Sequence, residues 1–263
     1  MGATSFDTYV HRESVMHRWS PRLKLISLVG LMFAFATVRQ LALVPWMLGL
    51  AALLYGLSGL PLAFLRQRLS YPGLFILALV VLLPLTVGDT VLAQWGALAL
   101  RREGLEATLL IVGRFLSILT LGFILLGTTP FLTLLHAMRS LGLPTILADM
   151  TLLSYRYLFE IAAMLATMQQ AMRLRGFGQR RQRWLRINGQ TMEQLAMLAG
   201  NLLIRSYEQS DRVYRAMRLR GYGYGTRPVI DAPSAAGGLS WGLAAAAAAA
   251  ALGFVIAEGS LRQ

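Results

Sequence analysis

The stretch LEATLLIVGRFLSILTLGFILL, residues 105–126, decides the class of fold. Only two of its side chains are charged, Glu106 and Arg114. A helix needs about 20 mostly apolar residues to cross the hydrocarbon core of a bilayer. The stretch therefore predicts a transmembrane helix.

Four more apolar stretches flank this one on both sides. They cover residues 23–38, 41–65, 73–87 (an extension to residue 100 stays open) and 238–257. The last contains an unbroken alanine run, residues 244–251. Small side chains let helices approach closely in lipid, but a weakly selected apolar helix would look the same. We predict an all-α polytopic membrane protein with about five transmembrane helices.

The composition supports a membrane protein. Hydrophobic residues make up 56% of the chain and charged residues 14%, and the mean hydropathy is +0.56. Soluble domains carry about 25% charged residues, so a soluble globule is excluded. The chain has no cysteine, which excludes disulfides, thiolate metal sites and cysteine nucleophiles. Residues 1–20 lack the basic-then-apolar order of a signal peptide, so we expect the first span to be an uncleaved anchor.

Positive charge is concentrated late in the chain. The formal net charge is +13, with 25 basic and 12 acidic residues, and Lys24 is the only lysine. Residues 139–227 hold 14 arginines and 5 acidic residues, a difference of +9. Such a block is typical of a cytoplasmic segment, and we prefer this explanation to nucleic-acid binding. We expect a cytoplasmic N-terminus, although Arg39, Arg101 and Arg102 then lie outside and count against it.

Three parts follow from this pattern. Residues 1–128 hold the first four spans, 129–233 a cytoplasmic helical domain, and 234–263 the last span. Within the middle part, Leu-Gly-Leu-Pro at 141–144 is a stop-and-restart signal between helices. We expect helices over 145–175 and over 201–220, the second beginning as early as Gln190. Between them lies a basic link with Arg180, Arg181, Arg183 and Arg186.

One hexapeptide, AMRLRG, occurs twice, at 171–176 and at 216–221, which are 216 − 171 = 45 positions apart. Each copy precedes an aromatic residue and a glycine. Glycine just past a helix end permits the left-handed cap, and arginines in the last turn favour the negative end of the helix dipole. A single copy would be an ordinary helix end. Two identical copies favour a pair of docking points for a partner with two like sites. The candidate residues are Ala171, Arg173, Arg175, Gly176, Ala216, Arg218, Arg220 and Gly221.

The paired Ala-x-Arg-x-Arg-Gly segments before a last span resemble the transmembrane T component of energy-coupling factor (ECF) transporters, above all the cobalt-type, CbiQ-like members. The stretch from Arg18 to Leu25, RWSPRLKL, is also similar to that family's entry into the first span. In both copies a leucine, Leu174 or Leu219, stands where the family signature has alanine.

The resemblance implies a non-catalytic coupling subunit in the cell (inner) membrane. Its partners would be two cytoplasmic ABC-type ATPase subunits and a membrane subunit that binds the substrate, with no cofactor of its own. Arg175 and Arg220 would contact the ATPases, supported by Arg173 and Arg218; which arginine of each pair makes the contact stays open. The cargo would be cobalt, with nickel or a vitamin as alternatives.

Two other classes stay open. An ion or solute channel could use Arg114, although we favour a structural pair for it, with Asp89 or Glu106. A lipid-modifying enzyme could bind phosphate through its arginines, but the acidic residues are scattered. The chain lacks a Gly-x-x-x-x-Gly-Lys-Ser/Thr loop, so it cannot itself be the ATPase. We expect no metal site, because the three histidines do not converge. They are His11, His17 and His136.

Overall fold

The computed structural model describes residues 16–17, 19–86, 91–95, 98–176, 189–223 and 237–261. The chain divides into two compact units. The first comprises Met1–Leu143 with Ser234–Gln263, and the second comprises Pro144–Pro233. The first unit continues to residue 143, and the end of the membrane part at residue 128 stays a prediction. On which side of the membrane each part lies stays a prediction.

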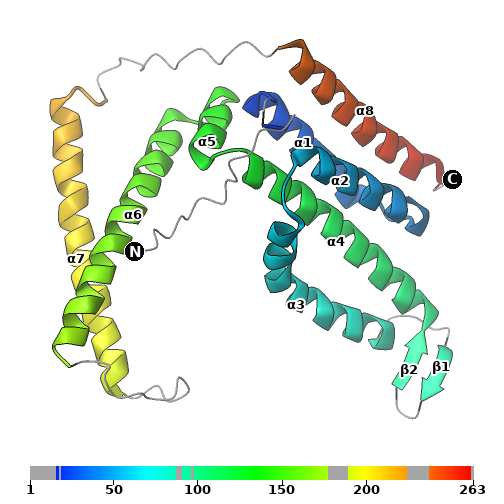
Figure 1. Ribbon diagram of the computed structural model, residues 1–263, viewed down its shortest axis with the longest axis horizontal. Helices are drawn as coiled ribbons and strands as arrows, with labels where there is room; N and C mark the ends of the chain where they lie inside the picture. The colour runs from blue at the N-terminus through cyan, green and yellow to red at the C-terminus, as the bar shows by residue number, and fades with distance from the viewer. Residues whose placement is uncertain are drawn as a thin grey trace. The chain divides into compact units, whose positions relative to one another are not determined.

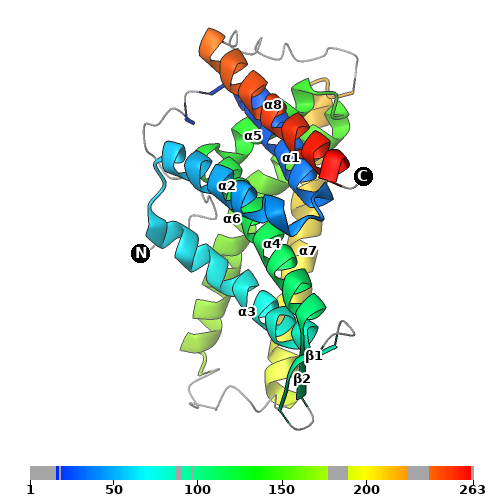
Figure 2. The ribbon, with the colours of Figure 1, turned by 90° about the vertical axis from the view of Figure 1, so that its right-hand side faces the viewer.

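Where the structure describes it, the first unit is built from helices apart from one short hairpin (Figures 1 and 2). Helix α4 crosses α1, α2 and α3, while α1 also packs against α5 and α8. The last helix of the chain therefore returns to lie beside the first. The elements are α1 (Pro21–Thr37), η1 (Leu41–Leu43), α2 (Val44–Ser58), α3 (Leu62–Thr86), β1 (Val91–Trp95), β2 (Leu98–Arg101), α4 (Arg102–Thr128), α5 (Phe131–Ser140) and α8 (Gly238–Leu261).

Three helical stretches among the described residues are long and apolar enough to cross a membrane. They are Leu41–Ser58, Arg102–Thr128 and Gly238–Ser260. They correspond to the second, fourth and fifth expected spans, and the fold is all-α and polytopic as predicted. Helix α1 is shorter than these three stretches. Helix α1 has 17 residues, and at 1.5 Å per residue it measures about 26 Å, somewhat less than the ~30 Å hydrocarbon core.

One expected boundary was wrong, and one that the sequence left open is now decided. The predicted span over 41–65 breaks at Gly59, which caps α2 in the left-handed conformation with φ +67°, and residues 62–65 belong to α3. The extension of the third span to residue 100, which the sequence left open, is not helical, because β1 and β2 form an antiparallel hairpin there. Gly88 and Gly96, which flank β1 in the sequence, weaken a helix there.

The core of the first unit lies where α1, α2 and α4 meet. Leu28, Leu31 and Phe35 of α1 are fully buried against Leu121 and Ile124 of α4. Helix α8 closes this core with an aromatic contact and with part of its alanine run. The rings of Phe35 and Phe254 meet edge to face with centroids 5.2 Å apart, and Ala250 and Ala251 pack beside them. At these two positions the small side chain permits close approach.

The turn after α1 is held by side chains from two other helices. Arg114 of α4 donates from Nη2 to the carbonyl oxygen of Val38. Glu258 of α8 accepts hydrogen bonds from the backbone N–H groups of Arg39 and Gln40, at 3.1 and 3.3 Å. Arg114 therefore has a structural contact, but among the described residues it has no acidic partner. Glu106 instead pairs with Arg102 at 3.0 Å, and Asp89 lies outside the described residues.

The second unit is an antiparallel pair, α6 (Thr145–Leu174) and α7 (Gly189–Leu219). Both predicted helices are confirmed, and so is the stop-and-restart signal before them. Gly142 has φ +110° and α6 begins three residues later. Glu160 accepts a hydrogen bond from Gln209 at 3.4 Å, and Asp149 lies 3.5 Å from the hydroxyl of Tyr222. The predicted basic link over 180–186 lies outside the described residues.

Close packing at Gly113 gives a test of the helix arrangement. A Cβ atom at Gly113 of α4 would overlap Cγ1 of Val44 in α2. Because a rigid β-branched side chain cannot easily withdraw, we expect Gly113→Ala to destabilise the protein by about 1–3 kcal/mol. Thermal unfolding of the purified protein in detergent measures the effect.

Gly122→Ala is the matched control on the same helix. A Cβ atom there meets only Cε of Met32, at 3.8 Å, which is ordinary contact. If the two variants melt at the same temperature, the packing of α2 on α4 described above is wrong.

Candidate functional site: the twin helix tips

The two copies of the hexapeptide form the C-terminal tips of α6 and α7, and their backbones have the same conformation. In the first copy, the N–H of Arg175 donates to the carbonyls of Ala171 and Met172, at 3.2 and 3.1 Å. The N–H of Gly176 donates to the carbonyl of Arg173 at 3.1 Å, and Gly176 has φ +82°. This left-handed glycine ends the helix, as the sequence predicts.

The second copy repeats every one of these bonds. The N–H of Arg220 donates to Ala216 and Met217 at 3.2 and 3.1 Å, and that of Gly221 donates to Arg218 at 3.0 Å. Gly221 has φ +83°. One further bond, from the N–H of Tyr222 to the carbonyl of Met217 at 3.0 Å, completes a Schellman cap. The two identical hexapeptides therefore form helix ends with the same backbone conformation.

Each tip presents an apolar side chain between charged ones. Leu174 is 82% exposed and Leu219 is 90% exposed. The four candidate arginines, Arg173, Arg175, Arg218 and Arg220, are also exposed. Such a combination suits a partner surface with an apolar pocket and an acidic rim.

None of the four candidate arginines forms a salt bridge with any acidic residue that the structure describes. The acidic residue closest in sequence to the α7 tip, Asp211, pairs with Arg215 at 2.6 Å. Arg218 instead lies over the ring of Tyr214, 6.0 Å from its centroid. The charges at both tips are therefore available to a partner.

The structure does not bring the two copies together but places them at opposite ends of the helix pair (Figures 1 and 2). Tyr222, just past the α7 tip, lies beside Asp149 near the start of α6. From Asp149 to Arg175, at the α6 tip, there are 175 − 149 = 26 positions. At 1.5 Å per residue the tips are therefore roughly 40 Å apart.

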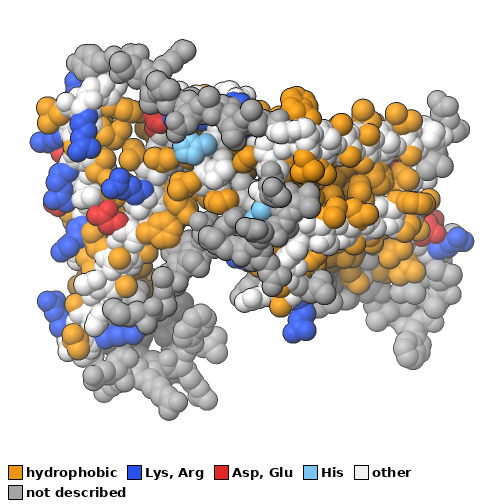
Figure 3. Space-filling view, turned by 45° about the horizontal axis from the view of Figure 1, so that its top comes forward, with side chains coloured by type: hydrophobic (Ala, Val, Ile, Leu, Met, Phe, Trp, Pro, Cys, Tyr) orange, Lys and Arg blue, Asp and Glu red, His pale blue; other side chains and the backbone are white. Residues whose placement is uncertain are grey.

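Sequence reasoning assigned the docking contact to the arginines and allowed the apolar Met and Leu between them to enter a hydrophobic groove, but it left both leucines out of the candidate set. Their signal was nevertheless in the sequence, since Leu174 and Leu219 occupy the last helical position in each copy. A side chain there projects beside the cap, where no further helical turn covers it. Figure 3 shows the wider setting, with Arg side chains scattered among exposed hydrophobic ones over α6 and α7.

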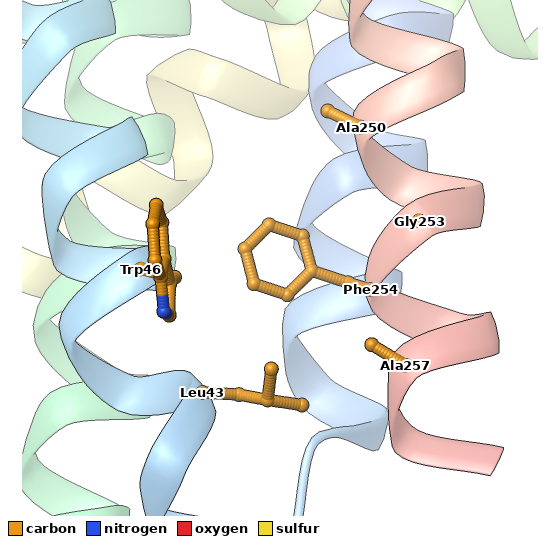
Figure 4. Close-up of a pocket in the computed structure, with 6 residues that line it drawn as sticks. All are labelled: Leu43, Trp46, Ala250, Gly253, Phe254 and Ala257. Atoms are coloured by element: carbon orange, nitrogen blue, oxygen red, sulfur yellow. The ribbon is translucent and has the colours of Figure 1, made fainter. Parts of the chain in front are cut away.

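A pocket of about 290 Å³ lies between α2 and α8, but it does not suit a polar ligand. Its lining comes from Leu43 and Trp46 on one side and from α8 on the other (Figure 4). All six lining residues are apolar or glycine: Leu43, Trp46, Ala250, Gly253, Phe254 and Ala257. Binding sites for small molecules usually add a few polar groups that fix orientation. The twin tips therefore stay the stronger candidate.

Comparison with known proteins points to a transport family. Residues 12–228 match the family of CbiQ cobalt transport proteins. Over 145 residues, 53% of this chain and 52% of the relative, the sequence is 34% identical to the energy-coupling factor transporter transmembrane protein EcfT of Limosilactobacillus fermentum. Over 121 residues, 46% of the chain and 42% of the relative, it is 31% identical to an uncharacterized protein of Methanocaldococcus jannaschii. The matches thus span about half the length of these relatives.

The cap geometry at the α7 tip gives a direct test. Alanine at Gly221 must adopt the same left-handed conformation, which costs about 1 kcal/mol. We therefore expect Gly221→Ala to loosen the last turn of α7 and to speed amide hydrogen exchange there about five-fold. Exchange measured by mass spectrometry reports this change.

Gly200→Ala, in the interior of α7, is the control. Its Cβ atom would meet nothing within 4 Å, as at Gly221, but Gly200 is not in the left-handed conformation. Alanine should slow exchange there, because it favours helix. Equal changes in the rate of amide hydrogen exchange from both substitutions would contradict a capping role for Gly221.

Proposed function

Because the chain belongs to the CbiQ cobalt transport protein family, we propose that it is the transmembrane coupling (T) subunit of an ECF-type ABC importer. It transmits the ATP-driven motion of two cytoplasmic ATPase subunits to a membrane subunit that binds the substrate. The observation that carries the proposal is the pair of identical, exposed helix tips.

The chemistry of each tip suits a protein socket. Burying a leucine side chain contributes about 1.5–3 kcal/mol, and Leu174 and Leu219 are already almost free of intramolecular contact. Arg175 and Arg220 can form charge-assisted hydrogen bonds with carboxylates beside such a pocket. A groove on each ATPase subunit with an apolar floor and an acidic rim would bind one tip in the helix-in-groove manner.

The symmetry of the helix pair suits a dimeric motor. Two antiparallel helices that end in the same hexapeptide are related by a local two-fold axis perpendicular to the pair. The contact between Glu160 and Gln209 lies near this axis. Arg175 is 175 − 160 = 15 positions beyond it on α6, and Arg220 is 220 − 209 = 11 positions beyond it on α7. A two-fold ATPase dimer would offer two like grooves to these two tips.

The remaining assignments follow from the family and from charge. Cobalt is the cargo that the family description supports, with nickel or a vitamin as alternatives bound by the partner membrane subunit. The chain itself is non-catalytic, needs no cofactor and spans the cell (inner) membrane several times. The arginine-rich block supports a cytoplasmic position for α6, α7 and the N-terminus.

Replacing the two outer arginines tests the proposal. We expect Arg175→Ala with Arg220→Ala to abolish ATP-driven uptake and to release the ATPase subunits, because both sockets lose a charged partner. Each single substitution should weaken binding by about ten-fold, the effect of one charge-assisted hydrogen bond. Pull-down from native membranes, with identification of the bound subunits, measures the change.

Arg205→Ala is the control, since Arg205 is an exposed arginine of α7 away from both tips. It should leave binding unchanged. Recovery of no nucleotide-binding subunit with the unsubstituted chain would contradict the proposed function. Full binding by the double variant would contradict the assigned role of the tips.

A further inference from the structure

The first turn of α1 carries two basic side chains that bond to the ends of other helices. Lys24 is 1% exposed. Its ammonium group donates to the carbonyl of Met16 at 3.0 Å, to the carbonyl of Thr128 at 3.3 Å and to the hydroxyl of Thr128. Thr128 is the last residue of α4. Lys24 thus places a buried hydrogen-bond donor at the C-terminal end of that helix, where the carbonyl groups need partners.

Arg22 does the same at the end of α5. Its Nη2 donates to the carbonyl of Ser140 at 2.9 Å, and its Nε donates to the hydroxyl of the same residue. Ser140 is the last residue of α5. The Ser140 hydroxyl in turn donates to the carbonyl of Ala137 at 2.6 Å. The bond between Arg22 and the Ser140 hydroxyl is therefore part of a short chain of hydrogen bonds that crosses from α1 to α5.

The cap of α5 leaves the carbonyl of Ser140 without a backbone partner, and Arg22 supplies one. The N–H of Leu143 donates to the carbonyl of Met138, and that of Gly142 donates to Arg139, both at 3.2 Å. This Schellman cap satisfies two of the last carbonyls but not that of Ser140. The guanidinium of Arg22 bonds to this part-buried carbonyl and thereby fixes the end of α5 to α1.

The position of this bond in the chain gives it mechanical significance. Ser140 precedes the first residue of α6, Thr145, by five positions. Only Leu141–Pro144 connect the clamped end of α5 with the helix that carries the first tip. A displacement of α6 reaches the membrane helices through α5 only if α5 is held against them.

We propose that Arg22 and Lys24 form a basic clamp that makes α4 and α5 move as one body with α1, so that motion of α6 is passed to the membrane helices. The coupling role rests on the proposed function. The clamp itself is a property of this chain alone. Arg22 and Lys24 are positioning residues, since they act through α4 and α5.

The isolated chain tests the clamp. The chain lacks cysteine, so spin labels attach only at introduced cysteines. Ile26 of α1 and Met138 of α5, 50% and 40% exposed, are suitable sites. Double electron–electron resonance should give a narrow distribution of the distance between the two labels, and this distribution should broaden in Arg22→Met. Arg22→Lys, which keeps one charged donor, should restore most of the narrow distribution, and Arg66→Met, an exposed arginine of α3, should leave it unchanged.

The complex with its ATPases tests the coupling. We expect Arg22→Met to keep ATPase binding and ATP hydrolysis while uptake per ATP hydrolysed falls on the order of ten-fold. Arg22→Lys should recover part of the loss. Ser140→Ala, which removes only the hydroxyl acceptor, is the substitute if Arg22→Met does not fold. It should give a smaller fall in uptake per ATP hydrolysed.

The outcomes separate the two claims. No ATPase binding by the unsubstituted chain would overturn the proposed function and the coupling role with it. Normal ATPase binding with an unchanged ratio of uptake to hydrolysis in the Arg22 variants would overturn the coupling role alone. An unchanged distance distribution in Arg22→Met would overturn the clamp itself.

Discussion

The last carbonyl groups of a helix have no partner within the helix, and away from bulk water each must find one elsewhere. This constraint shapes both units of the molecule. Helices α5, α6 and α7 each end at a left-handed glycine: Gly142, Gly176 and Gly221. In the first unit, basic side chains from other helices bond to carbonyl groups at the helix ends. Arg114 bonds to the carbonyl after α1, Lys24 to the end of α4 and Arg22 to the end of α5. The same requirement thus fixes the packing of the first unit and the form of the tips in the second.

A tip closed by its own backbone can leave its side chains free. At the ends of α6 and α7 the glycine cap satisfies the carbonyls without drawing on the arginines. The guanidinium groups and the exposed Leu174 and Leu219 therefore stay available to a partner. The ends of α4 and α5 are different, because basic side chains of α1 are used to hold them. Basic side chains consequently serve two purposes: they join helices in the first unit, and they remain available for recognition in the second.

Local signals in the sequence were sufficient for much of this account. The apolar run over 105–126 predicted α4, and the glycines after the repeated hexapeptide predicted where α6 and α7 end. The long-range contacts could not be predicted, because a basic side chain that bonds to a backbone carbonyl leaves no pattern in the partner's sequence. Arg114 and Val38 are 76 positions apart, and Arg22 and Ser140 are 118 apart. The antiparallel arrangement of the tips was equally hidden, since the link over 180–186 shows nothing of the direction in which α7 runs.

The central claim is that one antiparallel helix pair holds two identical tips apart for a two-fold partner. The distance between spin labels at Leu174→Cys and Leu219→Cys, measured by electron–electron resonance on the full chain, tests it most directly. A narrow distribution centred at roughly 40 Å is the expected result. A broad distribution, or a centre at about half that distance, would contradict the account, because the tips could not then engage two separate sockets at once.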